Sequence, residues 1–236
     1  MSNLIFDFLF PKRCVSCNKF GFYICSKCRR QLIFISQNIC PVCQRPSIDG
    51  QTHPGCSGQY CLDGLFSAFL YRPPIKKALH LFKYRPFLSD LASELVKLTK
   101  KSLKSNQDNF ITQFIKIERP IIAPIPIFSK KQKTRGFNQS EILGRLLAKE
   151  FRLAFSPDLF LRIKETKPQA KLKLEERKKN IKAAFVLNPE FSRLKISKNN
   201  LLLIDDIWAT GTTLKTCANL AKRKGFKKVW GLTIAR

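Results

Sequence analysis

The sequence predicts an α/β protein, built on a mainly parallel sheet, with a small cysteine-rich module in front of it. Apolar segments of strand length alternate with segments of helical spacing over residues 64–236. Eight of the nine cysteines fall between Cys14 and Cys61. Strands that alternate with helices favour parallel pairing, with helices on both faces of the sheet. We therefore divide the chain into residues 1–63 and residues 64–236.

The composition is that of a folded and strongly basic protein. Hydrophobic residues make up 44% of the chain and include 20 Phe, which excludes a wholly disordered protein. The net charge is +28, of which residues 1–64 carry +4 and the rest of the chain +24. An excess of this size favours a polyanionic partner, although a Lys-rich surface that serves only solubility has the same composition.

The cysteines of the first module form closely spaced pairs. Three pairs are separated by two residues and the last pair by four. In chain order the eight are Cys14, Cys17, Cys25, Cys28, Cys40, Cys43, Cys56 and Cys61. A pair of this kind turns two thiolates toward one point, and two pairs complete the tetrahedral coordination of zinc. Free buried thiols are the alternative. We predict one or two structural zinc ions.

Two pairing schemes remain open for these cysteines. In the sequential scheme, residues 14–28 bind one ion and residues 40–61 another; in the interleaved scheme, the first pair joins the third. We prefer the sequential scheme, because seven residues between the first two pairs suffice for a hairpin. His53 could replace Cys56 as a ligand, but we expect it to be a loop residue.

The cellular compartment decides between zinc and disulfides. Residues 1–10 lack the basic segment and cleavage site of a signal peptide, and they are too short to span a membrane. We expect them to form a short apolar helix on the body of the protein. No later stretch is long and apolar enough to cross a bilayer. We expect a cytoplasmic protein without membrane insertion, whose thiols stay reduced and favour zinc.

The remaining elements follow in chain order. Apolar runs bounded by turn residues predict strands over residues 64–71, 120–128, 158–163, 183–187, 200–204 and 227–234. Helical spacing predicts helices over residues 88–104, from Asn138 (with Glu141 as its capping partner) through residue 147, and over residues 211–224. Gly225 ends the last helix. The basic segments 129–136 and 164–179 are expected to be loops.

The clearest functional signal lies at the end of the strand over residues 200–204. Asp205 and Asp206 follow it, and Thr210-Gly211-Thr212-Thr213 precedes the next helix. A helix that begins after a parallel strand offers free N–H groups and the positive end of its dipole to a phosphate. Two carboxylates would repel that phosphate unless they bound something else, and paired ribose hydroxyls are suitable. A turn that merely caps a helix is the alternative.

Two common phosphate-binding loops are excluded at this place. There is no Gly-Lys-Ser/Thr of a Walker A loop and no G-x-G-x-x-G of a dinucleotide site. The segment instead resembles the phosphoribosyl pyrophosphate (PRPP) signature of type I phosphoribosyltransferases. The whole chain resembles the ComF family, competence-associated proteins with a zinc module ahead of such a domain.

The resemblance to the ComF family covers nearly the whole chain. Besides the cysteine pairs it includes residues 81–84 (LFKY), 124–126 (PIP), 135–139 (RGFNQ), Gln169, Arg177, Asn180, residues 184–185 (AF) and 232–236 (LTIAR). This sequence departs from the family in two places. Trp208-Ala209 stands where smaller residues and a Thr are usual, and Cys56-x4-Cys61 is wider than the usual second pair.

The resemblance implies a role for each of the matching residues. Asp205 and Asp206 would hold the ribose 2′ and 3′ hydroxyls, and together with Arg135 they are the expected catalytic residues. The PRPP contacts would come further from Ala209, Thr210, Gly211, Thr212, Thr213, Lys131 and Arg177. Residues 164–179 resemble a flap that closes over PRPP, with Lys171 as another cationic contact. Mg2+ would arrive bound to the pyrophosphate. Pyrophosphate would then leave C1 through an oxocarbenium-like transition state.

Two classes of function remain from the sequence. The first is an enzyme that transfers phosphoribosyl to an undefined acceptor or hydrolyses PRPP. The second is a non-catalytic competence protein that keeps the fold and binds single-stranded DNA with its basic surface. The acidic pair favours the first class, and the charge of the C-terminal part favours the second. Other proteins of the competence machinery are further expected partners.

Overall fold

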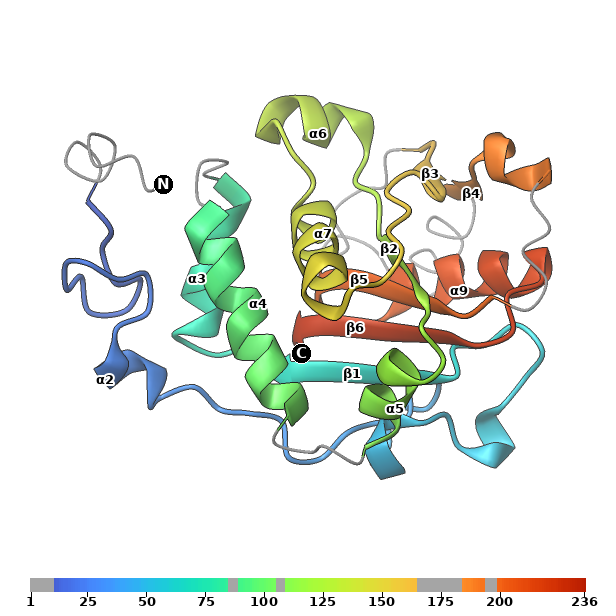
Figure 1. Cartoon of the computed structure of the whole chain (residues 1–236), viewed down its shortest axis with the longest axis horizontal. Helices are drawn as coiled ribbons and strands as arrows, with labels where there is room; N and C mark the ends of the chain where they lie inside the picture. Colours follow the sequence, from blue (N-terminus) through green and yellow to red (C-terminus); the bar gives the residue numbers. More distant parts are fainter. Residues whose placement is uncertain (1–10, 85–88, 105–108, 165–183, 194–198) are drawn as a thin grey trace.

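A four-stranded parallel sheet forms the centre of the protein (Figure 1). The structure is a computed structural model that describes residues 11–84, 89–104, 109–164, 184–193 and 199–236. The strand order is β1-β6-β5-β2, with every neighbouring pair parallel. The strands are β1 (Gly64–Phe69), β2 (Ile121–Pro124), β5 (Leu201–Ile207) and β6 (Val229–Ala235). The predicted mainly parallel α/β core is confirmed, and four of the six predicted strands form this sheet.

Helices cover both faces of this sheet, as predicted. Side chains alternate between the faces of a strand, and in β5 Leu202 and Ile204 belong to one core while Leu201 and Leu203 belong to the other. The first core also contains residues of α3 (Ile75–Tyr84), α4 (Ser89–Lys104), α5 (Phe110–Lys116) and α7 (Gln139–Phe151). The second contains α9 (Thr212–Lys224). In the described part of the chain, no helix combines the length and apolar character needed to cross a bilayer.

Two predicted strands pair with each other outside the main sheet. β3 (Phe160–Arg162) and β4 (Phe185–Leu187) form a separate antiparallel pair. Phe160 and Phe185 are buried in the α9 side of the core. The sequence predicted both strands but could not predict their partner, because pairing depends on contacts between distant segments. Most of the segment that joins them, the predicted loop over residues 164–179 with Lys171 and Arg177, lies outside the described residues.

Three local predictions differ from the structure. The predicted loop over residues 129–136 contains helix α6 (Ser129–Arg135), whose Lys, Gln and Arg residues are good helix formers and which Gly136 ends at φ 78°. The predicted strand over residues 120–128 ends at Pro124, because Pro124 and Pro126 have no N–H for a ladder. Helices α3 and α5 were not predicted. The short helix expected over residues 1–10 lies outside the described residues.

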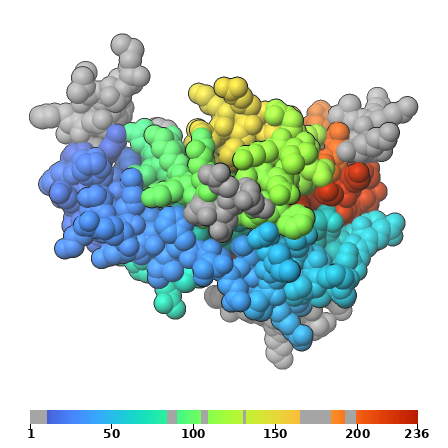
Figure 2. Space-filling model, turned by 60° about the horizontal axis from the view of Figure 1, so that its bottom comes forward, coloured from blue at the N-terminus to red at the C-terminus, as the bar shows by residue number. Residues whose placement is uncertain are grey.

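Residues 11–63 pack directly on the sheet and on α4. The N–H of Ile35 donates to the carbonyl of Ala68 at 3.1 Å, and Gln51 forms a bridge with Gly64. Cys14 and Ile24 lie in the same buried core as α3 and α4. Figure 2 shows this segment as a continuous blue band along one side of the molecule. It contains α2 (Ser26–Arg29) and the 3-10 turns η1 (Ile48–Gly50) and η2 (Pro54–Cys56); a further such turn, η4 (Pro189–Arg193), precedes β5.

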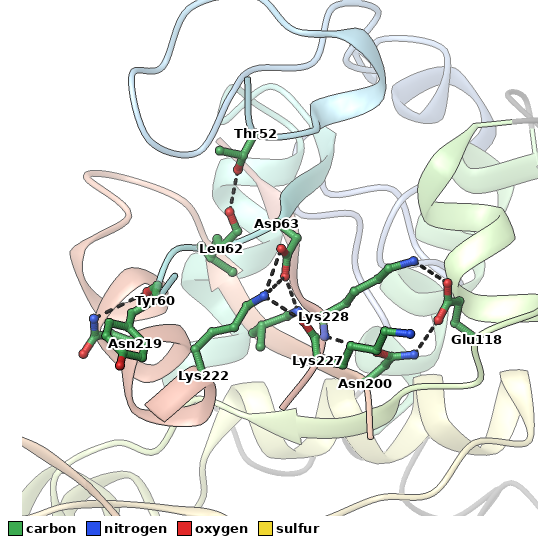
Figure 3. A network of polar contacts seen from close by, with 11 residues as sticks. Thr52, Tyr60, Leu62, Asp63, Glu118, Asn200, Asn219, Lys222, Lys227 and Lys228 are labelled. Carbon is green, nitrogen blue, oxygen red and sulfur yellow. Dashed lines mark hydrogen bonds and ion pairs between the residues drawn. The ribbon is translucent and has the colours of Figure 1, made fainter. Parts of the chain in front are cut away.

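A polar network fixes the end of this segment at one edge of the sheet, where strands begin (Figure 3). The Asp63 carboxylate lies 2.7 Å from Lys222 Nζ and accepts the N–H of Val229 at 2.6 Å. Glu118 accepts from Asn200 Nδ2 at 2.6 Å and pairs with Lys228. Since Val229 begins β6 and Asn200 immediately precedes β5, this network lies at the amino ends of the strands. The candidate site described next lies at their carboxyl ends.

Candidate functional site

The first four cysteines form one compact cluster. The sulfur atoms of Cys14, Cys17, Cys25 and Cys28 all lie within 4.8 Å of one another. Four sulfurs bound to one zinc ion at about 2.3 Å would be separated by about 3.8 Å in a tetrahedron, and Cys17 Sγ lies 3.5 Å from Cys25 Sγ. The arrangement therefore fits zinc. It follows the sequential pairing scheme rather than the interleaved one.

The thiols of this cluster differ in acidity. Burial raises the pKa of Cys14, but hydrogen bonds from the backbone N–H groups of Cys25, Cys17 and Ser16 outweigh it and lower that pKa to about 6. Burial and the neighbouring thiols raise the pKa of Cys28 to about 12. The four sulfurs can therefore not all be thiolates unless a positive ion lies among them. A zinc ion supplies that charge and would bind through all four.

The second cluster contains a histidine in place of the expected Cys61. Its members are Cys40, Cys43, His53 and Cys56, again within 4.8 Å of one another. His53 Nδ1 lies 3.4 Å from Cys43 Sγ, and Nε2 lies 2.9 Å from the carbonyl oxygen of Pro46. A proton on Nε2 would satisfy that carbonyl and leave the Nδ1 lone pair toward the thiols. This is the usual environment of a zinc-bound histidine, whose other nitrogen donates to a carbonyl.

In the structure His53 lies in this cluster and Cys61 does not, although Cys61 was the expected ligand. The turn η2 folds the N–H of Cys56 onto the carbonyl of His53 at 2.9 Å, which brings both side chains to the cluster. Cys61 belongs to a following turn, closed by its own N–H on Gly58. The sequence did carry the signal: His53 and Cys56 are separated by two residues, as in the cysteine pairs. The two clusters together support structural zinc in residues 14–56.

The acidic pair lies at the carboxyl end of β5. The strand continues through Asp205 and Asp206 to Ile207, beyond its predicted end. Asp205 Oδ1 accepts the hydroxyl of Ser140 and the N–H of Asp206, both at 2.9 Å. Asp206 Oδ2 lies 2.9 Å from Lys83 Nζ. The two carboxylates are thus held by two different helices, α7 and α3.

A small cavity opens beside the pair, at the start of α9. Its walls are Asp205, Ile207, Ala209, Thr210, Gly211, Thr212, Thr213 and Leu214. Gly211 precedes the helix with φ +69°, and a Cβ atom there would lie 2.1 Å from the Trp208 ring. Only glycine suits that position. The structure therefore gathers Asp205 and the five predicted residues 209–213 around one cavity. Asp206 is not one of its walls.

Trp208, one of the departures from the family pattern, does not line this cavity. Its side chain is buried with the α9 core. The ring packs under Gly211, and Lys215 Nζ lies 5.6 Å from the ring centroid. The indole therefore supports the loop from beneath instead of filling the cavity.

The segment RGFNQ joins the acidic pair to three neighbouring elements. Asn138 accepts the N–H of Ser140 at 3.1 Å as the cap of α7 and donates to the carbonyl of Ile125 at 3.0 Å. Arg135 donates to Gln139, whose amide donates in turn to the carbonyl of Lys83, both at 3.4 Å. Arg135 is thus linked to the site through Gln139. The side chains of Lys131 and Arg177, two other expected contacts, lie outside the described residues.

Sequence reasoning missed two side chains that contact the acidic pair. Lys83 lies in the LFKY segment and Ser140 directly follows RGFNQ. Both segments matched the family pattern, and that match was the signal for them. Their contacts with β5 span 123 and 65 residues of chain, so spacing along the sequence could not reveal them.

Asp205 has a strongly perturbed acidity. Burial and the charge of Asp206 raise its pKa from 3.8 to about 7, against hydrogen bonds from Ser140 and the Asp206 N–H and the charge of Lys83. The carboxyl therefore ionises less readily than an ordinary aspartate. Strong shifts of this kind are typical of functional sites in clefts.

Known proteins resemble this chain both in its cysteine-rich segment and over most of its length. Residues 5–63 match the family described as "Double zinc ribbon domain". The chain is 29% identical over 217 residues to "DNA utilization protein YhgH" of Salmonella typhimurium, covering 89% of each protein. It is 27% identical over 230 residues to "Competence protein F" of Haemophilus influenzae, covering 89% of this chain and 96% of that protein. The resemblance to the ComF family is confirmed. "Competence protein ComFC" of Bacillus subtilis is 26% identical over 212 residues, covering 86% of this chain and 79% of that relative.

The ligand set of the second cluster can be tested by zinc content. Cys61→Ser should keep about two zinc ions per chain, whereas Cys56→Ser should keep about one, because each structural ion needs four ligands. Cys28→Ser should abolish soluble protein, because Cys28 lies in the core shared with α4 and residues of the second cluster do not, and structural zinc contributes on the order of 10 kcal/mol to modules that fold on metal. Elemental analysis of gel-filtered protein measures the ratio. Loss of one ion in Cys61→Ser, with both ions kept in His53→Asn, would restore the ligand set first expected.

The acidity of Asp205 predicts a pH-dependent stability. Because its folded pKa is raised, its contribution to stability is complete below about pH 4 and is lost as the pH rises through about 7. Asp205→Asn removes this titration. The Tm of the variant minus that of the wild type should therefore increase between about pH 5 and about pH 8. Asp158→Asn, at an exposed position, controls for the loss of one negative charge. An equal difference at both pH values would contradict the raised pKa.

Proposed function

We propose that the protein binds PRPP at the carboxyl end of β5 and acts as a phosphoribosyltransferase of the ComF type, in the cytoplasm, in a process linked to DNA uptake. The observation that carries this proposal is the cavity formed by Asp205 and residues 209–214 at the start of α9. A helix N-terminus favours phosphate, and adjacent carboxylates favour hydroxyl groups. PRPP has a phosphate and neighbouring hydroxyls close to each other, since its ribose hydroxyls and its 5-phosphate belong to one sugar.

Each residue has a distinct role in this proposal. The backbone of residues 209–213 and the hydroxyls of Thr210, Thr212 and Thr213 bind the 5-phosphate. Asp205 and Asp206 accept the ribose hydroxyls, for which both carboxylates must be ionised. Arg135 is the last residue of α6. In this proposal the diphosphate extends toward it, and Lys131 and Arg177 would contact the diphosphate as well. Mg2+ bound to the diphosphate supplies further positive charge, through oxygen ligands.

The reaction then follows from these positions. The bond from C1 to the diphosphate oxygen breaks, and its electron pair leaves with the diphosphate. Positive charge develops on the ribose ring and is stabilised by the nearby carboxylates. A nucleophilic acceptor, or water, supplies the electron pair of the new bond at C1. Residues 1–63 serve in this scheme as a zinc-stabilised module that supports the catalytic domain formed by residues 64–236.

Binding of single-stranded DNA is a second candidate function. Two relatives carry names that refer to DNA utilization and to competence. The net charge of +28 gives the chain a strong attraction for polyanions. In this role the basic helix α6 (Ser129–Arg135), beside the proposed PRPP site, is the candidate contact. The protein would bind DNA through phosphates, with little dependence on base sequence.

Asp205 and Asp206 provide the decisive test of PRPP binding. Replacing both with Asn keeps their shape and removes their charge. Each hydrogen bond to a charged group contributes roughly 1.5–3 kcal/mol, so the double variant should bind PRPP with Mg2+ more than about tenfold more weakly. Isothermal calorimetry measures the affinity, with Asp158→Asn as the control for charge. Equal affinity of the double variant would misplace the site, and a wild type without PRPP binding would overturn the enzyme proposal.

Gly211→Val tests the same site by another route. The added side chain would clash with the Trp208 ring and obstruct the approach of phosphate to the backbone. We expect a loss of PRPP affinity comparable with that of the double Asn variant. A thermal scan of the purified variant separates loss of binding from loss of fold.

Salt dependence tests the DNA proposal. Affinity for a single-stranded oligonucleotide should fall steeply with salt, with a logarithmic slope of roughly −0.7 per neutralised phosphate. Replacing Lys130, Lys131 and Lys133 with Glu should make this slope shallower. The same change at Lys97, Lys101 and Lys104 of α4 is the matched control for net charge. Equal effects of the two triple variants would contradict a site on α6, and binding indifferent to salt would contradict electrostatic binding altogether.

A further inference from the structure

The side chain of Lys83 directly contacts the acidic pair. Its Nζ lies 2.9 Å from Asp206 Oδ2, at the end of α3. The side chains of Lys83 and Asp206 are 25% and 14% exposed. Ion pairs at exposed positions contribute little because water screens them, but water screens this pair much less. The positive charge of Lys83 therefore acts on the acidic pair with little screening.

The backbone of Lys83 is anchored to the same part of the protein. Its carbonyl accepts the amide of buried Gln139 at 3.4 Å, and Gln139 immediately precedes Ser140, which donates to Asp205. The preceding residue, Phe82, is 1% exposed and packs against Phe137 with ring centroids 5.9 Å apart. Lys83 is thus fixed on both sides of its own backbone. Its side chain is held where it meets Asp206.

Two neighbouring carboxylates need such a cation to be ionised together. The groups that face Asp205 are Asp206 in β5, Ser140 in α7, Lys83 in α3 and the buried thiol of Cys217 in α9. Burial and Asp206 raise the pKa of Asp205, and the charge of Lys83 lowers it. Burial, and next the charge of Asp205, raise the pKa of Cys217, so that thiol is neutral at physiological pH. Lys83 therefore opposes the repulsion within the pair.

We propose that Lys83 is a positioning residue of the PRPP site, which orients Asp206 and balances the charge of the acidic pair so that both carboxylates can accept ribose hydroxyls. This inference rests on the proposed function. It adds a residue of α3 to the site, besides the acidic pair and the loop before α9. If Lys83 instead competed with the ribose for Asp206, its removal would tighten binding.

Lys83→Met tests this role by calorimetry with PRPP and Mg2+. At pH 7 the affinity should fall, by up to about tenfold for each unit by which loss of the Lys83 charge raises the pKa of Asp205. At about pH 8.5 the difference from wild type should shrink, because Asp205 then ionises without help. Lys83→Arg should restore binding at both pH values. Lys83→Gln serves for the same comparison if the Met variant does not fold.

The control is Lys228→Met, which removes the same charge from an ion pair at the opposite end of the sheet (Figure 3). Its PRPP affinity should equal that of the wild type. Failure of the wild type to bind PRPP would reject the proposed function. If the wild type binds PRPP, three results would reject the role of Lys83 alone. These are equal binding by Lys83→Met at pH 7, tighter binding by it, and a deficit of the same size at both pH values.

Discussion

The pairing of β5 on both of its edges is the interaction on which the candidate site depends. Hydrogen bonds to β2 and β6 fix this strand in register, with Ile204 opposite Pro124 on one side and Leu232 on the other. Its first four residues are fully buried, and its last three, which begin with Asp205, are partly buried. The acidic pair therefore lies at the boundary between core and solvent, where a carboxylate can be both held and reached. The loop before α9 directly follows β5, so the position of the strand also fixes the start of the loop.

The N-terminal cysteine-rich segment packs against the sheet and its helices. Cys14, Cys25 and Cys28 lie in the same core as α4, so the first cluster is built into the packing of the sheet. Near the second cluster, Lys215 of α9 donates to the carbonyl of Val42 at 3.4 Å, and Lys222 of the same helix binds Asp63. The helix that begins at the candidate phosphate cavity is therefore in contact with the cysteine-rich segment along its length. Zinc that orders this segment would also support the helix.

The sequence predicted those features that depend on short stretches of chain. Periodicity gave the strands and three helices, because burial imposes a period on nearby residues. The turn from Asp205 to Thr213 was predicted for the same reason, since a glycine and the adjacent threonines carry the signal locally. What could not be predicted depends on distant contacts: the antiparallel pairing of β3 with β4, and the meeting of Lys83 and Ser140 with β5. His53 is a different case, because its spacing from Cys56 is visible in the sequence but the turn that brings both side chains to the cluster is not.

The acidic pair is an expensive arrangement for a protein that needs only to fold. Asp205 is desolvated and repelled by Asp206, and both effects disfavour its charge. An amide oxygen at position 205 could also accept the Ser140 hydroxyl and the Asp206 N–H, without a charge to desolvate. Carboxylates differ from amides in that they accept hydroxyl hydrogens more strongly. A ligand that brings hydroxyls to the pair and a phosphate to the start of α9 would use both features at once. This combination favours a phosphorylated sugar over a simple anion at the site.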